Sequence, residues 1–170
     1  AIVRALRRTA DIVRLTYDAA GTYDQAHSQL PKTLNQPHFQ RRPQPTLEDR
    51  LDTVGFDMLR GEKDEALHLA ERCLADVESA ADALKPSDYR QFSDLFEGAI
   101  FIIKAFRARL EMAHARKVYR ESPSEAARQG LASAVSAAEE LADAIRARFG
   151  DDFYGGLVKT LEQLTEEAGE

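Results

Sequence analysis

Apolar residues recur alternately three and four positions apart along nearly every long segment of this chain. In the first segment they are Val3, Leu6, Ala10, Val13, Tyr17 and Ala20. In the longest segment they are Phe92, Phe96, Ala99, Ile103, Phe106, Leu110 and Ala113. Because steps of three and four return to the same side of an α-helix, this spacing gives each helix one apolar face. The sequence therefore predicts an all-α bundle whose helices bury these faces against one another.

Glycine and proline divide the first half of this pattern into segments. A first helix over residues 2–20 ends at Gly21, since glycine is common just past a helix end. Residues 21–46 contain four prolines and no periodicity, which predicts a Pro-rich connection. A second helix begins at Thr46, and Gly61 marks the turn to a third helix over about residues 62–84.

The second half of the chain predicts the longest helix, over about residues 87–121. Its middle is apolar beyond the stripe, at Ile100, Phe101 and Ile102, so we expect it to be the central element, covered on several sides. Ser122 is placed to cap the next helix, which runs to about residue 149. Its inner face is Ala127, Leu131, Ala134, Ala138, Leu141, Ile145 and Phe149.

A short last helix carries Leu157, Leu161 and Leu164. The tight turns between the long helices predict antiparallel hairpins. We therefore expect about five long helices plus a short C-terminal helix, forming a single helical domain over residues 1–170. Because nothing introduces the first helix, we also expect this domain to be part of a longer chain.

Composition limits the function classes. Apolar content of 44% and charged content of 31% are typical of a folded globular domain. The net charge of -6 argues against nucleic acid as a partner, and no apolar run approaches the roughly 18 residues of a membrane span. The single cysteine, Cys73, lies among apolar neighbours, which predicts a small buried thiol. One cysteine fits a reducing compartment such as the cytoplasm but leaves export open.

Two Glu-x-x-His steps are the strongest candidate for metal chemistry. They are Glu65 with His68 and Glu111 with His114, the spacing by which two helices of a di-iron carboxylate bundle each supply two ligands. Each of these residues lies beside, not on, the apolar stripe of its helix. We therefore interpret all four as exposed polar residues, expect no cofactor, and keep a metal-binding bundle as an alternative.

The Pro-rich connection holds a second candidate, the residues Phe39, Arg41 and Arg42. Two arginines beside an aromatic ring are suited to an anion or an RNA base, so nucleic-acid or anion binding through this basic loop is a further alternative. The simpler interpretation is a loop that Phe39 pins onto the bundle.

Two resemblances to known families bear on the fold. The first rests on Gly61, Ala66, Leu67, Ala70, Cys73 and Leu74. These residues resemble the second helix of a tetratricopeptide repeat, which has glycine at the turn, an Ala-Leu pair, and small or apolar residues thereafter. The resemblance implies a helical hairpin and not a peptide-binding groove.

The second resemblance is one of arrangement. The layout begins with an amphipathic helix from Ile2 to Tyr17 and continues with a Pro-rich crossing. Long hairpins follow, with Tyr119 and Pro123 at the second turn. This layout looks like the all-helical region that follows the catalytic barrel in large bacterial glycoside hydrolases. The resemblance implies that the catalytic carboxylates lie in a preceding domain, with none in this chain.

The sequence contains no Ser-His-Asp arrangement, Gly-rich phosphate loop or Cys-x-x-Cys pair. We therefore expect a non-catalytic helical packing or interaction domain of a larger protein. An apolar face left uncovered by the bundle is suited to docking, and the residues around Ile100 to Ile102 are the candidate. The expected partners are a neighbouring domain of the same chain, another protein, or a second copy in a homodimer.

Overall fold

The computed structural model describes residues 1–18 and 47–169 of the chain. Its helices are α1 (Ile2–Val13), α2 (Leu47–Thr53), α3 (Phe56–Glu78), α4 (Pro86–Glu121), α5 (Glu125–Phe149) and α6 (Leu157–Gly169). Shorter helical turns follow α1 at Arg14–Asp18, α3 at Ala81–Ala83 and α5 at Phe153–Gly155. The described residues contain no strand, so the predicted all-α fold is confirmed.

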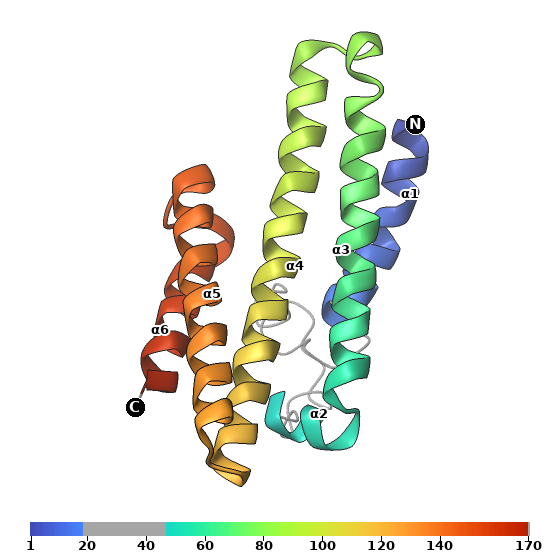
Figure 1. The fold of residues 1–170 in the computed structure, drawn as a ribbon. Coiled ribbons are helices and arrows are strands. Elements are labelled where there is room, and N and C mark those ends of the chain that lie inside the picture. Colours follow the sequence, from blue (N-terminus) through green and yellow to red (C-terminus); the bar gives the residue numbers. More distant parts are fainter. Residues whose placement is uncertain (19–46, 170) are drawn as a thin grey trace, which may run out of the picture.

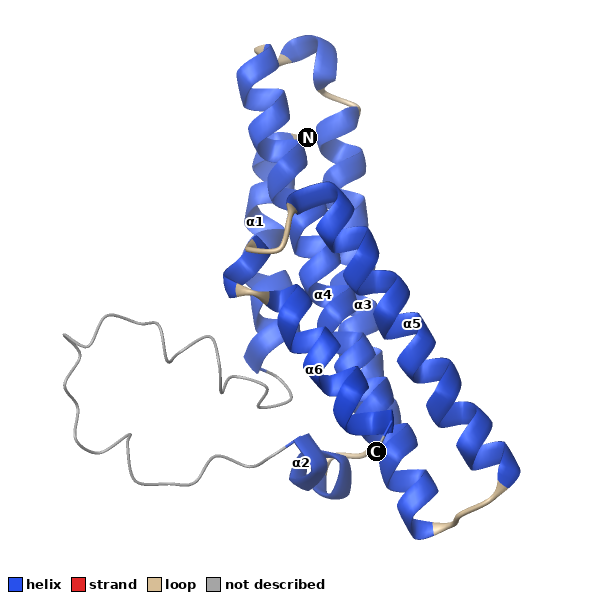
Figure 2. Ribbon diagram, turned by 90° about the vertical axis from the view of Figure 1, so that its left-hand side faces the viewer, coloured by secondary structure: helices blue, strands red, loops and turns tan. Residues whose placement is uncertain are grey.

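The hairpin of α3 and α4 forms the long axis of the molecule (Figure 1). The 36 residues of α4 span about 54 Å at 1.5 Å per residue. From the far end of α4, α5 returns antiparallel along it, and α6 folds back along α5 (Figures 1 and 2). On the opposite side of the hairpin, α1 lies along α3. The predicted antiparallel hairpins are thus confirmed.

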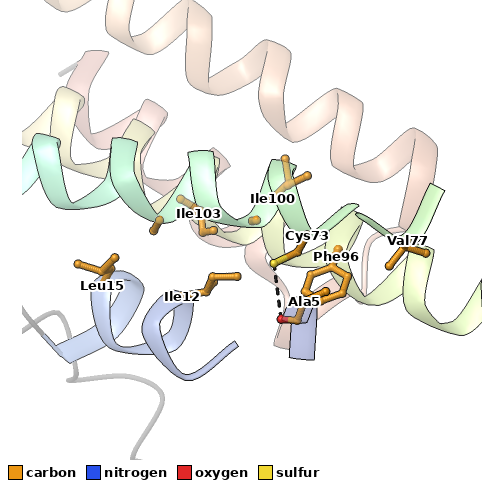
Figure 3. Close-up of a cluster of buried hydrophobic side chains, with 10 residues drawn as sticks. Ala5, Ile12, Leu15, Cys73, Val77, Phe96, Ile100 and Ile103 are labelled. Carbon is orange, nitrogen blue, oxygen red and sulfur yellow. Dashed lines mark hydrogen bonds between the residues drawn. The ribbon is translucent and has the colours of Figure 1, made fainter. Parts of the chain in front are cut away.

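Two hydrophobic clusters use different faces of α4. Phe96, Ile100 and Ile103 pack toward α1 and α3 (Figure 3), whereas Ala105 and Met112 pack toward α5 and α6. A smaller cluster joins α2, α3 and α4 through Leu51, Leu59 and Leu110. The predicted central position of this helix is therefore confirmed.

The prediction that residues around Ile100 to Ile102 form a spare docking face is wrong. Ile100 is only 8% exposed and belongs to the cluster with α1 and α3. Phe101 and Ile102 are half-buried against the cluster of α5 and α6. This apolar run is explained by the need of α4 to cover two sets of helices, and it leaves no face free.

The predicted inner face of α5 is confirmed. All of its residues are buried or half-buried, namely Ala127, Leu131, Ala134, Ala138, Leu141, Ile145 and Phe149. Leu157 and Leu161 of α6 are likewise buried, and Leu164 is half-buried, as predicted for the short C-terminal helix. Alanines at the contact let α5 approach α4 closely, because they place little side chain between the two backbones.

The predicted turn at Gly61 is wrong, because Gly61 lies inside α3. The break falls at Gly55, where φ is 92° and ψ is 147°, a backbone conformation that only glycine adopts without strain. The third helix therefore begins at Phe56 and ends at Glu78, earlier at both ends than predicted. Thr46, the predicted start of the second helix, lies outside the described residues.

The predicted cap of the fifth helix is also displaced by two residues. Ser122 ends α4, and Ser124 caps α5 by accepting a hydrogen bond from the backbone N–H of Ala127 at 3.1 Å. Both serines can cap a helix, but the extended backbone at Ser124, with φ of -151° and ψ of 162°, is the conformation that an N-cap requires. Pro123 thus lies between α4 and α5.

A seam of small residues joins α1 to α3. Ala5 of α1 and Ala66, Ala70 and Cys73 of α3 are all 0% exposed. Figure 3 shows Ala5 and Cys73 side by side. The Cys73 thiol donates a hydrogen bond to the carbonyl oxygen of Ala5, with a distance of 3.6 Å between Sγ and oxygen. Such short side chains allow close contact between the two helices. The position of α1 therefore depends on the side chains of this seam staying small.

Enlarging the seam tests this dependence. We expect Ala70→Leu to lower the free energy of unfolding by about 1–3 kcal/mol, because a leucine there forces α1 away from α3. Urea denaturation followed by circular dichroism measures the change. Ala75→Leu is the matched control, since Ala75 is exposed on the same helix. Equal stability of the two variants would contradict a tightly packed seam.

Candidate interaction surface

Helix α1 has two apolar faces, and only one of them is buried. Ala5, Ile12 and Leu15 are between 0% and 5% exposed and pack against α3 and α4. The opposite face carries Val3, Leu6, Ala10 and Val13, all of which are exposed. We call these four residues the α1 stripe. The exposed fractions of its larger side chains are 65% for Val3, 41% for Leu6 and 51% for Val13.

The prediction that the α1 stripe packs inside the bundle is therefore wrong. Its predicted extension to Tyr17 and Ala20 lies outside the described side chains. The buried face holds Ala5, Ile12 and Leu15 and is flanked by the half-buried Arg8 and Thr9, so this side of α1 is less hydrophobic than the stripe. Close packing of α1 on α3 requires small side chains, and this requirement outweighs the greater hydrophobicity of the other face.

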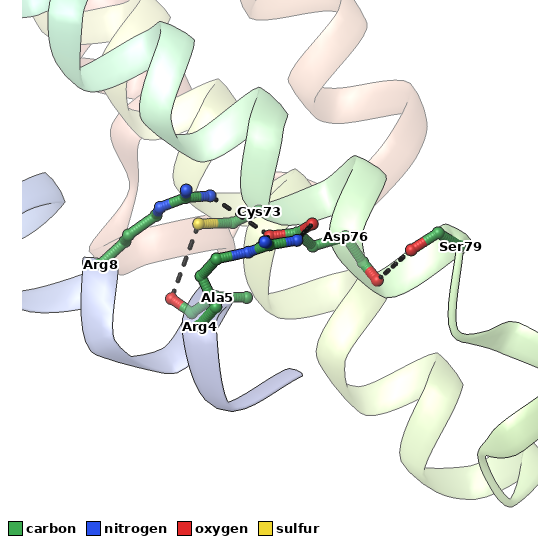
Figure 4. A network of polar contacts seen from close by, with 6 residues as sticks. All are labelled: Arg4, Ala5, Arg8, Cys73, Asp76 and Ser79. Atoms are coloured by element: carbon green, nitrogen blue, oxygen red, sulfur yellow. Dashed lines mark hydrogen bonds and ion pairs between the residues drawn. The ribbon is translucent and has the colours of Figure 1, made fainter. Parts of the chain in front are cut away.

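One end of α1 is held by a carboxylate on α3. Asp76 accepts a hydrogen bond from Arg4 Nη2 at 2.6 Å and another from Arg8 Nη1 at 3.2 Å (Figure 4). The hydrogen bond from Arg4, with the charges of both arginines, holds the pKa of Asp76 below its ordinary value. Asp76 is 15% exposed at its side chain, so this ion pair lies at the edge of the seam.

The other end of α1 is held by a buried lysine. Lys63 of α3 is 1% exposed, and its Nζ donates hydrogen bonds to the carbonyl oxygens of Leu15, at 2.7 Å, and Thr16, at 2.8 Å. These carbonyls lie in the π-helical turn that ends α1, where the partial negative charge of a helix end favours a cation. Burial lowers the pKa of Lys63 from its ordinary 10.5 to about 8.

Arginines line the α1 stripe. Arg7 and Arg14 are exposed and form no ion pair with any residue that the structure describes. Arg4 keeps 63% of its side chain exposed despite its contact with α3. Burial raises the pKa of Glu62 on α3, and the nearby charge of Arg14 acts in the opposite direction without an ion pair. The only acidic residue of α1 is Asp11, so α1 carries a net positive charge in a chain of net charge -6.

The four candidate metal ligands do not gather at one point. Glu65 and His68 are exposed on α3, as predicted, whereas Glu111 and His114 are half-buried on α4, so the prediction that all four are exposed is wrong for these two. Within residues 1–18 and 47–169, no group of three or more His, Cys, Asp or Glu side chains is arranged to hold a metal ion.

Glu111 and His114 have structural contacts instead. Glu111 accepts a hydrogen bond from Arg107 at 3.0 Å and lies 3.5 Å from Arg60 Nε. Both arginines also pair with Asp64, which closes a ring of four alternating charges between α3 and α4. The imidazole of His114 stacks on the ring of Phe56, with 3.9 Å between the ring centroids.

Phe39, Arg41 and Arg42, the candidates for anion binding, lie outside the described residues. Cys73 is 0% exposed, as predicted for a small buried thiol, and burial raises its pKa, which disfavours the reactive thiolate. Among the described helices, none is both long and apolar enough to cross a membrane.

No family model matches this chain, and neither a curated protein nor a solved structure is significantly similar to it. The class that the fold defines is an all-α helical bundle. Its most distinctive surface feature is the exposed α1 stripe with its arginines.

The role of Lys63 is testable through pH. Folding lowers the pKa of Lys63 from 10.5 to about 8, so between these values the unfolded chain binds a proton that the folded chain has lost. The free energy of unfolding should therefore rise from pH 8 to pH 10.5, by on the order of 3 kcal/mol from this group. Urea denaturation of wild type and Lys63→Met across this range measures the difference, in which groups common to both proteins cancel.

The matched control is Lys159→Met, at an exposed position on α6. This variant should keep the wild-type dependence on pH, because the side chain it removes is exposed to water in the folded chain as it is in the unfolded chain. Parallel curves for wild type and Lys63→Met would show that Lys63 keeps its ordinary pKa on folding.

Proposed function

We propose that this chain is a non-catalytic helical interaction domain of a larger protein, and that it makes contact through the α1 stripe. The observation that supports this most strongly is the exposure of Val3, Leu6 and Val13 on one face of one helix. Single exposed apolar residues are ordinary on protein surfaces, but a contiguous set at helical spacing is typical of a face that packs against a partner. Helix docking uses this spacing of anchors.

The causes of the pKa shifts of Lys63 and Asp76 also support a non-catalytic role. Catalytic residues commonly have perturbed pKa values because their surroundings are arranged for chemistry. Here burial lowers the pKa of Lys63, and the hydrogen bond and charges of two arginines lower the pKa of Asp76. Both residues hold α1 on α3, Lys63 through two backbone carbonyls and Asp76 through two arginines. Their surroundings serve the packing of helices.

The finer form of the proposal is an accessory domain of a glycoside hydrolase. What supports it is the layout, in which an opening amphipathic helix precedes long antiparallel hairpins. In this form the α1 stripe is the face that contacts the neighbouring domain.

Site-specific crosslinking tests the proposal. A photo-crosslinking amino acid at position 3 or 13, introduced into the protein in its source cells, should form a covalent adduct with the same partner from both positions. The partner is identified from the crosslinked peptides by mass spectrometry, and it is either another protein or another part of the same polypeptide. Leu6→Glu should abolish the adduct, because it places a charge in the middle of the contact.

The matched control is the same crosslinker at Ser133, an exposed position on α5. It should give no adduct with the partner found from the stripe. Absence of an adduct from positions 3 and 13, or the same adducts from Ser133, would refute the stripe as the contact surface.

A further inference from the structure

We propose that the α1 stripe binds an acidic amphipathic helix, whose apolar residues pack on the stripe and whose Asp or Glu side chains pair with Arg7 and Arg14. This inference rests on the proposed function and specifies the chemistry of the partner. It is argued from the positions of the arginines, from the covered side of α1 and from the side chains of the stripe.

The two arginines lie along one edge of the stripe. Arg7 follows Leu6 and Arg14 follows Val13, so they are seven residues apart and lie on the same side of the apolar row. We call Arg7 and Arg14 the arginine edge. In paired helices, residues that flank the apolar row determine partner and orientation through their charges. Two exposed guanidinium groups without an ion pair in the described structure therefore favour carboxylates on the partner.

The other edge of the stripe is covered by the bundle itself. Ile2 and Thr9 lie there, and both are half-buried, with Ile2 packed against the cluster that α1 forms with α3 and α4. A partner helix thus has open access to the stripe from the arginine edge and restricted access from the other. The charged contacts of the partner must then be made with the arginine edge.

A second copy of this chain fits the surface less well. Two α1 helices in antiparallel contact would place Arg7 of one copy opposite Arg14 of the other. These two positive charges would repel each other. Two α1 helices in parallel contact would place the arginine edge of one against the edge of the other that α3 covers. Neither arrangement gives the arginines an opposite charge.

A lipid surface also fits less well. Helices that lie on membranes insert bulky side chains such as Trp, Phe and Leu, whereas the stripe offers valine, leucine and alanine over a helix of 12 residues. A protein helix, which gains from close packing of small apolar residues, is the better match.

Two synthetic peptides test the inference on the full chain. Both are fluorescein-labelled amphipathic helices with the same leucine row, and they differ only in having Glu or Lys at the flanking positions. Fluorescence anisotropy at low ionic strength measures their affinities, because exposed charge pairs are screened by salt. We expect the Glu peptide to bind at least about tenfold more tightly than the Lys peptide, as expected when like charges replace opposite charges.

Charge reversal supplies the decisive comparison. Arg7→Glu combined with Arg14→Glu should invert the preference, so that the Lys peptide binds more tightly. The matched control reverses two exposed arginines outside α1, Arg90→Glu with Arg128→Glu, and has the same net charge. It should keep the wild-type preference. Leu6→Glu should weaken binding of both peptides.

Each contrary result has a distinct meaning. Equal binding of the two peptides, or an unchanged preference in the Arg7 and Arg14 variant, would overturn the acidic partner and leave the α1 stripe as a contact surface. If sedimentation velocity shows a dimer and Leu6→Glu abolishes it, the partner is a second copy and the acidic partner is overturned. Sedimentation with phosphatidylserine vesicles that depends on Leu6 would overturn it in favour of a lipid surface. Unchanged peptide binding in Leu6→Glu would remove the stripe, and with it the proposed function.

Discussion

The arrangement of the whole molecule depends on the burial of α4 on two faces. Phe96 and Ile103 belong to the cluster with α1 and α3, while Ala105 and Met112 belong to the cluster with α5 and α6. Because one helix supplies both clusters, the two halves of the molecule are positioned relative to each other by a single rigid element. A substitution on either face of α4 thus affects one cluster directly and the other through the same helix.

The same hairpin also determines which side of α1 meets solvent. Asp76 and Lys63 lie on α3 about as far apart as the two ends of α1, and each holds one end. Between them the small residues of the seam bring the helices close. The energetic cost of burying the Lys63 ammonium is offset in part by two carbonyl acceptors at a helix end. With both ends held, α1 cannot rotate to bury the stripe.

Periodicity was sufficient to predict the fold class, the central place of α4 and the inner face of α5. Periodicity failed where two nearby residues of the same type are both candidates for one turn or one cap. Gly55 and Gly61 are both turn candidates, and only the backbone conformation at Gly55 distinguishes them. Ser122 and Ser124 can both cap a helix, and the choice depends on where the chain leaves α4. Such choices depend on tertiary packing, which a linear pattern does not encode.

The candidate surface could be predicted only in part. The residues of the α1 stripe were visible in the sequence, but the pattern indicated them as core, because hydrophobicity alone does not reveal which face a neighbour covers. The signal that was available is the second set of residues on the same helix, Ala5 with Ile12 and Leu15. A helix at the surface of a bundle needs one apolar face to pack on its neighbours. A second apolar face on the same helix is therefore left exposed. The ion pair of Glu111 with Arg60 carried no sequence signal, because Arg60 lies on another helix, whereas the pair with Arg107 has the i,i+4 spacing of one helix.

The arginine edge resolves a difficulty that the exposed stripe creates. A row of apolar side chains on a surface helix favours association with any other apolar row, including that of another copy. Arg7 and Arg14 make such contacts less favourable unless carboxylates are present opposite them, so the same two charges oppose self-association and favour an acidic partner. Arg7 and Arg14 alone then favour an acidic partner over a second copy of the chain. The price in stability is small, since both guanidinium groups remain in water.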